Sequence, residues 1–388
     1  MNAPDSGTDR AADEAPSAAP TTSFATSSAP SSSVGSTGDV GRSRERFGSA
    51  ELAIVLSRYD LGEIESIKEF PRGSRKAPKL IIRCENGKFL LKRRAGGRDD
   101  PYKVAFAHEI QLALSRQQFP LPRLIGTRRD NNSMLERNGA IYELFEYISG
   151  TGYDNSLQAT GEAGRILALF HKLLREFRSE YKPQVGSYHA SKSVQRSMKI
   201  APQTLGRIDR DGRNADEIQA LVRSLDTSYR AAASRVVEAG LDEWPTQIVH
   251  CDWHPGNMLF RGDRVVAVID YDSARIQQRI TDVANGALQF SILGGGEDPA
   301  EWPDYVDVTR FRRFLATYES VPECIVSKAE IEAIPWLMIE ALIAESVIPI
   351  ANTGTFARLE GFSFMRMVER KVQWIETHAD ELIAAAAQ

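Results

Sequence analysis

A change of pattern near Gly152 constrains the fold of this chain more than any other feature of its sequence. Before this glycine, short apolar and β-branched runs alternate with turns, which is typical of strands. We expect strands at 64–70, 79–84, 88–91, 124–127 and 140–147, with an Asn-Gly hairpin turn between the second and third. One helix is expected at 103–117, because apolar residues recur there every three or four positions. The first part of the chain therefore predicts an antiparallel sheet with one main helix.

After Gly152 the pattern is mainly helical. Helical periodicity covers 162–177, 216–239, 282–290, 308–318, 328–350 and 359–378, and Pro335 predicts a break in the fifth of these helices. Strand-like runs at 247–249, 258–260 and 265–269 interrupt this region, and a turn joins the last two. We expect an α+β protein with a sheet-containing N-terminal lobe, 47–148, and a larger, mostly helical C-terminal lobe, 149–388.

Residues 1–46 differ in composition from the rest of the chain. They are almost entirely Ser, Ala, Thr, Pro, Gly and Asp, so burial of apolar side chains cannot offset the entropy cost of ordering them. We expect a disordered tail. A transit peptide is the weaker alternative, because the segment contains acidic residues and few arginines.

Charge and cysteine content argue against several classes of protein. The 48 Lys and Arg residues nearly balance the 52 Asp and Glu residues, for a net charge of -4, so no overall attraction to nucleic acid or to an anionic membrane is expected. The three cysteines form no C-x-x-C pair, which argues against a disulfide framework or a cysteine zinc site. No apolar run reaches the roughly 18 residues of a membrane span. We expect a cytoplasmic protein.

Three polar residues around the embedded strands can carry chemistry. Asp252 lies in a loop after the first strand, Asn257 precedes the second, and Asp270 follows the third. If the second and third strands pair, Asn257 and Asp270 meet at one end of the hairpin. An amide oxygen and a carboxylate suit Mg²⁺, which usually keeps water and phosphate oxygens as its other ligands. Asp252 could then accept a proton from an attacking hydroxyl.

The run from His250 to Asn257 has the H-x-D-x-x-x-x-N spacing of a kinase catalytic loop. Together with Ile269-Asp270 and Thr281-Asp282-Val-Ala284, it resembles the aminoglycoside phosphotransferase and choline kinase superfamily. The resemblance implies a bilobal protein-kinase-like fold and an enzyme that transfers the γ-phosphoryl group of ATP, with Mg²⁺, to a hydroxyl group.

The resemblance also implies roles for individual residues. Asp252 would be the catalytic base, and Asn257 and Asp270 would hold the magnesium ion. His250 and His254 would brace the catalytic loop. Asp282 would be structural, unless it only caps the helix that begins there.

In the N-terminal lobe the resemblance implies a nucleotide site. Lys92 corresponds to the lysine that holds the α- and β-phosphates, and Glu109 in the following helix corresponds to its ion-pair partner. Arg93 and Arg94 are alternative cations, and strand alternation puts Arg94 on the same side as Lys92.

Two further segments are expected to contact the nucleotide. The loop at 70–78 has one glycine, where protein kinases have G-x-G-x-x-G. Its residues Gly73, Ser74, Arg75 and Lys76 either cover the phosphates or form a solvated basic turn. Main-chain groups of the inter-lobe linker, around Glu146, Tyr147 and Ile148, are expected to hold the adenine.

The acceptor is less constrained than the nucleotide. Segments such as 142–150 look like the spore-coat-kinase-like and type II homoserine-kinase-like subgroup, whose members act on different alcohols. We expect a hydroxyl group of a small molecule as acceptor, with a site drawn from Tyr153, Trp253, Asp272, Arg275, Glu340 and Glu345. A Ser/Thr protein kinase of the same fold and a catalytically silent nucleotide-binding regulator are the alternatives. The oligomeric state and the choice between ATP and GTP stay open.

Overall fold

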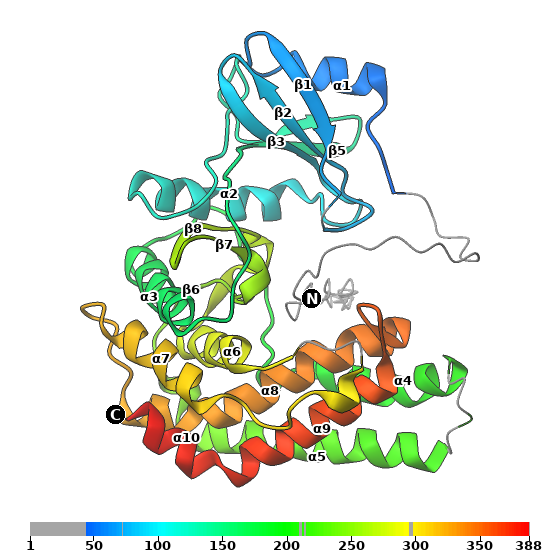
Figure 1. Cartoon of the computed structure of the whole chain (residues 1–388), viewed down its shortest axis with the longest axis vertical. Helices are drawn as coiled ribbons and strands as arrows, with labels where there is room; N and C mark the ends of the chain where they lie inside the picture. The colour runs from blue at the N-terminus through cyan, green and yellow to red at the C-terminus, as the bar shows by residue number, and fades with distance from the viewer. Residues whose placement is uncertain (1–43, 72, 209–211, 213–214, 295–297, 388) are drawn as a thin grey trace, which may run out of the picture.

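The protein has two lobes, one built on a sheet and one built from helices (Figure 1). The structure is a computed structural model and describes residues 44–71, 73–208, 212, 215–294 and 298–387. The expected α+β fold with a larger helical lobe is confirmed. Most of the predicted tail lies outside the described residues, but Arg44 and Glu45 already bond to the main chain of Ser74 and Arg75.

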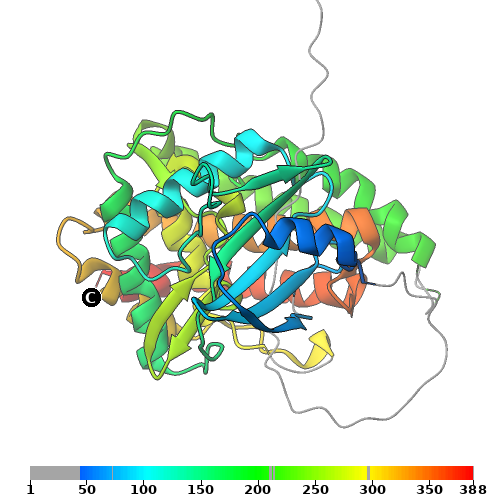
Figure 2. The same ribbon diagram turned by 90° about the horizontal axis from the view of Figure 1, so that it is seen from above.

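The N-terminal lobe is an antiparallel sheet with strand order β1-β2-β3-β5-β4. Its elements are α1 (Ser49–Leu56), β1 (Ile64–Glu69), β2 (Lys79–Cys84), β3 (Gly87–Arg93), α2 (Pro101–Arg116), β4 (Leu135–Arg137) and β5 (Ala140–Glu146). The hairpin expected around Asn86-Gly87 is confirmed, since Cys84 pairs with Gly87. An apolar cluster lies between the sheet and α1, which covers the strands in the view from above (Figure 2), whereas α2 lies between the sheet and the C-terminal lobe (Figure 1).

The C-terminal lobe carries two short β-ladders on a helical base. Its main elements are α3 (Leu157–Leu174), α4 (Lys192–Ile208), α5 (Ala215–Glu238), β6 (Thr246–Val249), β7 (Met258–Arg261), β8 (Arg264–Val268), β9 (Arg275–Gln278), α6 (Ile280–Ser291), α7 (Val308–Glu319), α8 (Lys328–Thr353), α9 (Gly361–Thr377) and α10 (Ala379–Ala386). The β7–β8 hairpin and the β6–β9 ladder face the N-terminal lobe, and α4, α5, α8 and α9 form the far end of the molecule (Figure 1).

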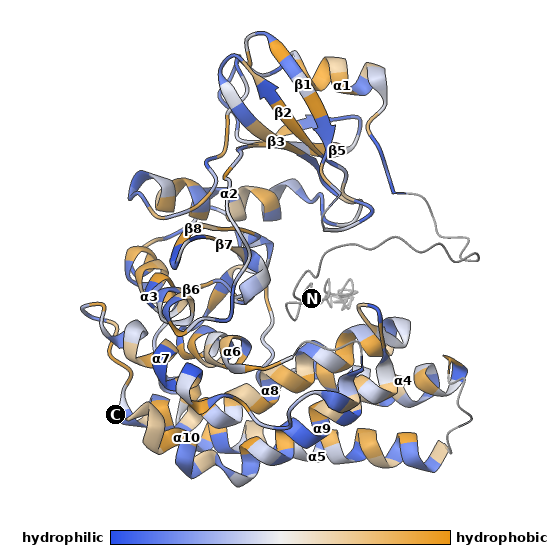
Figure 3. Cartoon of the chain, in the orientation of Figure 1, coloured by the Kyte–Doolittle hydropathy of each residue, from blue (hydrophilic) through white to orange (hydrophobic). Residues whose placement is uncertain are grey.

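The long helix α8 is the centre of the helical base. It is apolar around most of its circumference (Figure 3), and 78% of its most apolar window is buried inside the protein although its length and composition would suit a membrane span. This is the pattern of a core helix. The predicted break at Pro335 is wrong, because the helix continues through Pro335 and Pro349. Each proline removes one backbone hydrogen bond, and the burial of the surrounding apolar side chains outweighs that loss.

Two further differences from the expected elements have simple causes. The strand expected at 124–127 is only an isolated bridge between Leu124 and Phe145, and β4 takes the edge of the sheet instead. Helix α4 was not expected because it contains Pro202 and Gly206, yet its buried residues Val194, Met198, Ala201 and Leu205 have helical spacing. Packing of this apolar face stabilises the helix although the helix propensities of Pro202 and Gly206 are low.

Close packing of α3 against α7 depends on Gly164. A Cβ atom at this position would lie 2.2 Å from the Phe314 carbonyl oxygen. We expect Gly164→Ala to lower the free energy of unfolding by about 1–3 kcal/mol, because the two helices must separate. Gly206→Ala is the matched control: it is in α4 with open space around it, so the better helix propensity of alanine should stabilise by roughly 0.5–1 kcal/mol. Urea denaturation measures both, and equal effects would contradict this account.

Candidate active site

The β7–β8 hairpin brings Asn257 and Asp270 together, as the sequence predicts. Met258 pairs with Val268, and the Ile269 N–H donates to the Asn257 carbonyl oxygen at 2.9 Å. Asp270, the next residue, has φ 65°, a left-handed conformation in which an Asp side chain is tolerated better than most. Asn257 and Asp270 are therefore close together at one end of the β7–β8 hairpin.

Asp252 is bonded directly to Asn257. The Asn257 Nδ2 group donates to the carboxylate Oδ2 of Asp252 at 2.8 Å and to its main-chain oxygen at 3.0 Å. Because the amide nitrogen is used in this way, the amide oxygen is the atom that can face a metal ion. Asp252 is 5% exposed, so its carboxylate is held in one orientation next to the predicted metal ligands.

His254 braces the same carboxylate. Its Nδ1 atom accepts the Gly256 N–H at 2.9 Å, so the proton of the neutral ring is on Nε2. This atom lies 3.4 Å from Oδ1 of Asp252. Asp252 is thus flanked by Asn257 on one oxygen and by His254 on the other.

The main chain of the loop is held by Asp282. This buried carboxylate accepts the N–H groups of His250 at 2.5 Å and Cys251 at 2.8 Å, and Cys251 has the strained φ of 60°. His171 Nε2 lies 3.3 Å from the same carboxylate. Asp282 is therefore a structural support for the loop rather than the N-cap of α6, which begins at Ile280.

His250 supports the loop by packing. Its ring is fully buried among Phe170, Trp253 and Tyr271, and neither ring nitrogen has a hydrogen-bond partner in the described structure. Burial lowers the pKa of His250 despite the charges of Asp282 and Asp252. A neutral, unpartnered imidazole 0% exposed is a packing group and not a proton carrier.

Other carboxylates act on the charge of Asp270. Asp270 contacts solvent, yet partial desolvation by the surrounding protein, followed by the charge of Asp272, raises the pKa of its carboxyl. The charge of Asp252 acts in the same direction, and Lys92 opposes it. No cluster of three or more acidic, His or Cys side chains that could hold a metal ion is found among the described residues. A carboxyl that other carboxylates repel, beside the amide oxygen of Asn257, still fits a divalent cation that keeps water and phosphate oxygens as its other ligands.

Lys92 is in the site, but its predicted partner is wrong. Its ammonium lies 3.4 Å from Glu143 and 3.8 Å from Asp272. Glu109 instead bonds to the Ser179 hydroxyl and accepts the Glu180 N–H at 3.3 Å, because this face of α2 turns toward the segment after α3. Glu143, on β5 directly opposite Lys92, is the functional residue that sequence reasoning missed. Its signal was an acidic residue inside an otherwise apolar strand.

Arg94 links this lysine to the C-terminal lobe. Its guanidinium bonds both oxygens of Asp272, at 2.7 and 2.9 Å, and also Glu143 at 2.8 Å. His108 on α2 bonds the same Glu143 oxygen at 2.8 Å. Burial would raise the pKa of Glu143, but the charges of Lys92 and Arg94 hold it well below its usual value. Arg94 lies on the Lys92 side of β3, as expected, and Arg93 points to Glu51 on the other side.

The two segments that are expected to contact the nucleotide differ in which of their main-chain groups already form hydrogen bonds. In the 70–78 loop, Ser74 accepts from Arg44, Lys76 and Ala77, and residues 73–76 are exposed. In the linker, the N–H groups of Glu146 and Tyr147 bond to Arg123 and Lys88. No backbone hydrogen bond of Ile148 is found among the described residues. The adenine prediction therefore narrows to the main chain of Ile148.

Most of the expected acceptor residues have structural partners. Trp253 is fully buried, Tyr153 bonds Thr160, Asp272 bonds Arg94, Arg275 bonds the Gly186 carbonyl, and Glu340 pairs with His189 at 2.7 Å. Glu345 on α8 also has partners, since it accepts a hydrogen bond from Gln289. It is set apart by the charge of Asp252, which acts on Glu345 and helps to raise the pKa of its carboxyl.

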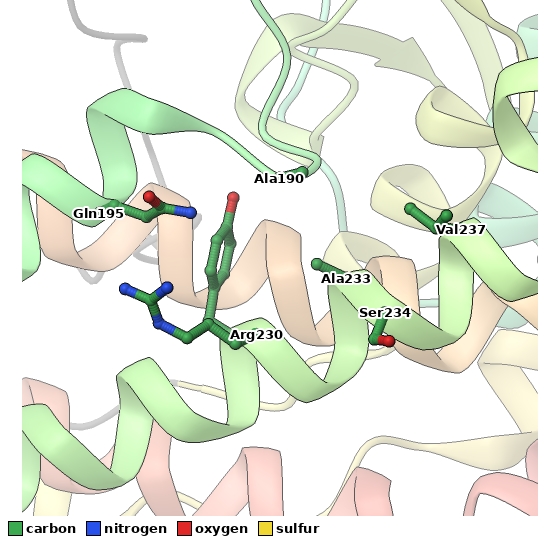
Figure 4. A pocket seen from close by; sticks show the side chains of 7 residues that line it. Ala190, Gln195, Arg230, Ala233, Ser234 and Val237 are labelled. Carbon is green, nitrogen blue, oxygen red and sulfur yellow. The ribbon is translucent and has the colours of Figure 1, made fainter.

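A shallow hollow elsewhere on the C-terminal lobe is separate from these residues. It measures about 310 Å³ and is lined by Ala190, Gln195, Tyr229, Arg230, Ala233, Ser234 and Val237, most of them on α5 (Figure 4). Its lining is mainly apolar and includes none of the residues around Asp252. The candidate site is therefore the charged region between the hairpin and β3.

The partner of Lys92 can be tested by stability. Glu143→Gln should lower the free energy of unfolding by about 3–5 kcal/mol, because it removes the fully buried charge shared by Arg94 and Lys92 and leaves Asp272 as their one carboxylate partner among the described residues. Glu109→Gln should cost no more than about 1 kcal/mol, since its amide oxygen can still accept from Ser179. Thermal and urea unfolding of the two variants measure this difference. A larger loss of stability for Glu109→Gln than for Glu143→Gln would instead support the pair predicted from the sequence, Lys92 with Glu109.

Some known proteins are similar to this chain in sequence, and others have a similar fold. A homoserine kinase of Bradyrhizobium diazoefficiens is 26% identical over 298 residues, or 74% of this chain and 79% of its own. An aminoglycoside phosphotransferase of Alicyclobacillus acidocaldarius superposes over 88% of this chain and 98% of its own, with 19% identity and a TM-score of 0.60. An amicoumacin kinase in complex with AMP-PNP, Ca²⁺ and Ami covers 85% and 94%, with 14% identity and a TM-score of 0.59.

The family assignment follows from these comparisons and from the model of the phosphotransferase enzyme family, which matches residues 66–342. The protein-kinase-like fold is confirmed, and so is the expected reaction class, phosphoryl transfer to a hydroxyl group of a small molecule. The chain belongs to the phosphotransferase enzyme family.

Proposed function

We propose that the protein transfers the γ-phosphoryl group of Mg²⁺-bound ATP to the hydroxyl group of a small amino alcohol. The observation that supports this most is the group formed by Asp252, Asn257 and Asp270, in which one carboxylate is oriented by the amide of a predicted metal ligand. Lys92 lies across from this group on the other lobe, with Asp272 as their common neighbour.

The oxygen atoms of Asn257 and Asp270 would hold the magnesium ion. When bound, the ion neutralises charge on the phosphates and aligns them for transfer. Lys92 would bind the phosphates from the side of the N-terminal lobe, while Glu143 fixes its side chain. Most of the rate enhancement then comes from position and charge, as is usual in phosphoryl transfer.

Asp252 would orient the acceptor hydroxyl and take its proton. Asn257 and His254 hold its two oxygens, so the carboxylate has a fixed direction. His250 and Asp282 keep the main chain of the loop in place behind it.

Two substitutions separate the proposed roles. Asp252→Asn should reduce kcat by about 10²–10⁴-fold, the usual contribution of a general base, while Mg·ATP binding stays near that of wild type. Asp270→Asn should weaken Mg·ATP binding and raise the Mg²⁺ concentration needed for turnover. Asp263→Asn, in the exposed turn of the same hairpin, is the matched control. Calorimetric titration and steady-state kinetics measure both, and near-wild-type turnover of Asp252→Asn would reject the assignment.

Glu345 is proposed to bind the ammonium group of the acceptor. It is half-buried on α8, near Asp252 and bonded by Gln289. A carboxylate next to the proposed base can hold an amino alcohol with its hydroxyl directed at Asp252. Homoserine is such an alcohol, and the relative from Bradyrhizobium diazoefficiens is a homoserine kinase, which makes homoserine the first acceptor to assay.

This proposal predicts a dependence on pH. Desolvation, followed by the charge of Asp252, raises the pKa of Glu345 to about 8, so most of it is protonated at neutral pH when no acceptor is bound. Binding of an ammonium group requires the ionised form. The acceptor KM should therefore fall as the pH rises from about 6.5 to 8.5.

The same kinetic series in Glu345→Gln should give a high acceptor KM that no longer changes with pH, and an unchanged KM for ATP. Glycerol, which lacks an amine, should show no such pH dependence in either protein. An acceptor KM of the wild-type protein that does not change with pH over this range would contradict the role of Glu345. A change in the KM for ATP in Glu345→Gln would contradict it too.

A further inference from the structure

A second lysine lies beside Lys92 on the sheet. Lys79, the first residue of β2, is directly opposite Lys92, which is directly opposite Glu143 on β5. Directly opposite residues of antiparallel strands share a face of the sheet. The three side chains therefore form one row, here called the Lys79–Lys92–Glu143 row, on the face opposite the apolar cluster that contains Leu80 and Leu91.

The other cations around this row are in ion pairs, whereas Lys79 is not in one within the described part of the chain. Glu143 is matched by Lys92 and Arg94, and Asp272 is matched by Arg94. Among the described residues, no ion pair or hydrogen bond of the Lys79 ammonium is found. Like charges directly opposite each other in a sheet repel. The ammonium groups of Lys79 and Lys92 are therefore adjacent, and Glu143 is the one fully buried carboxylate in this row.

The Lys79 ammonium lies against the glycine turn of the 70–78 loop. A Cβ atom built on Gly73 would be 2.8 Å from Lys79 Nζ, and Gly73 has φ +81°. Partial burial, followed by the charge of Lys92, lowers the pKa of Lys79, whereas Asp270 and Glu143 raise it. The ammonium is thus near the loop on one side and near the predicted metal ligand Asp270 on the other.

We propose that Lys79 is a second phosphate-binding cation, which contacts the terminal phosphates of the nucleotide beside Lys92. This rests on the proposed function, because it assigns a residue to the same nucleotide site. The loop above it has one glycine instead of three, so it offers fewer close main-chain N–H groups to the phosphates. Lys79 supplies positive charge at that position, and Glu143 neutralises part of the charge of Lys92.

The test compares how Lys79→Met binds ligands that differ only in phosphate number. Calorimetric titration of the full chain with adenosine, AMP, Mg·ADP and Mg·ATP gives the four affinities. We expect the loss in Lys79→Met to grow with phosphate number and to reach about tenfold or more for Mg·ATP, as for a charge-assisted contact. Adenosine affinity should stay within about twofold of wild type. Lys79→Arg should retain most of the Mg·ATP affinity.

Lys68→Met is the matched control, because Lys68 is exposed on β1 of the same sheet. It should leave all four affinities unchanged. Without nucleotide, the melting temperature of Lys79→Met should be no lower than that of wild type, since the substitution removes a repulsion. If Lys79→Met does not fold, Lys79→Gln replaces it in the same series.

Three results would overturn the proposal in different ways. An equal loss for adenosine and Mg·ATP would mean that Lys79 only supports the fold. Wild-type Mg·ATP affinity in Lys79→Met and Lys79→Gln would reject the role of Lys79 and leave the proposed function standing. Absence of any nucleotide binding by the wild-type protein would reject the proposed function itself, and the role of Lys79 with it.

Discussion

One buried carboxylate, Glu143, holds the cations of the N-terminal lobe in a defined arrangement. It is fully buried, yet it contacts Lys92, Arg94 and His108, which come from β3 and α2. An isolated carboxylate would be protonated in such a place, and two cations keep it charged. Since Arg94 also binds Asp272 in the C-terminal lobe, the position of Lys92 relative to the β7–β8 hairpin depends on this one group.

The catalytic loop is fixed by a separate set of contacts. Asp282 binds two consecutive N–H groups of the loop, and aromatic rings enclose His250. These contacts come from α6 and from the apolar core beneath it, so they hold the loop from the C-terminal lobe. The strained conformations of Cys251 and Asp270 persist because the residues around them leave the main chain no alternative.

The sequence predicted the parts of this structure that depend on local pattern. The β2–β3 hairpin follows from Asn86-Gly87, and the meeting of Asn257 with Asp270 follows from two short strands and a turn. The Lys92–Glu109 pair failed because helix periodicity does not say which face of α2 meets the sheet. An acidic residue within apolar β5 marks Glu143 as unusual, but its pairing with Lys92 follows only from the register of β3 and β5. The proposed contacts of Ser74 and Ile148 with the nucleotide remain predictions.

Helix α8 also resisted local rules, since two prolines inside it would end an isolated helix. Its burial on nearly all sides made the tertiary contacts decisive. Elements whose sequence and packing agree, such as β2, were predicted with correct ends. Elements that rely on packing alone, such as α4, were not.

The contact of Arg94 with Asp272 has a consequence for movement of the lobes. Wide separation would break two short hydrogen bonds and expose Arg94 and Glu143, which are 6% and 0% accessible. The desolvated charges make such a rupture costly. Rotation about this contact keeps the bonds intact, so the lobes are expected to rotate about Arg94 rather than to separate fully.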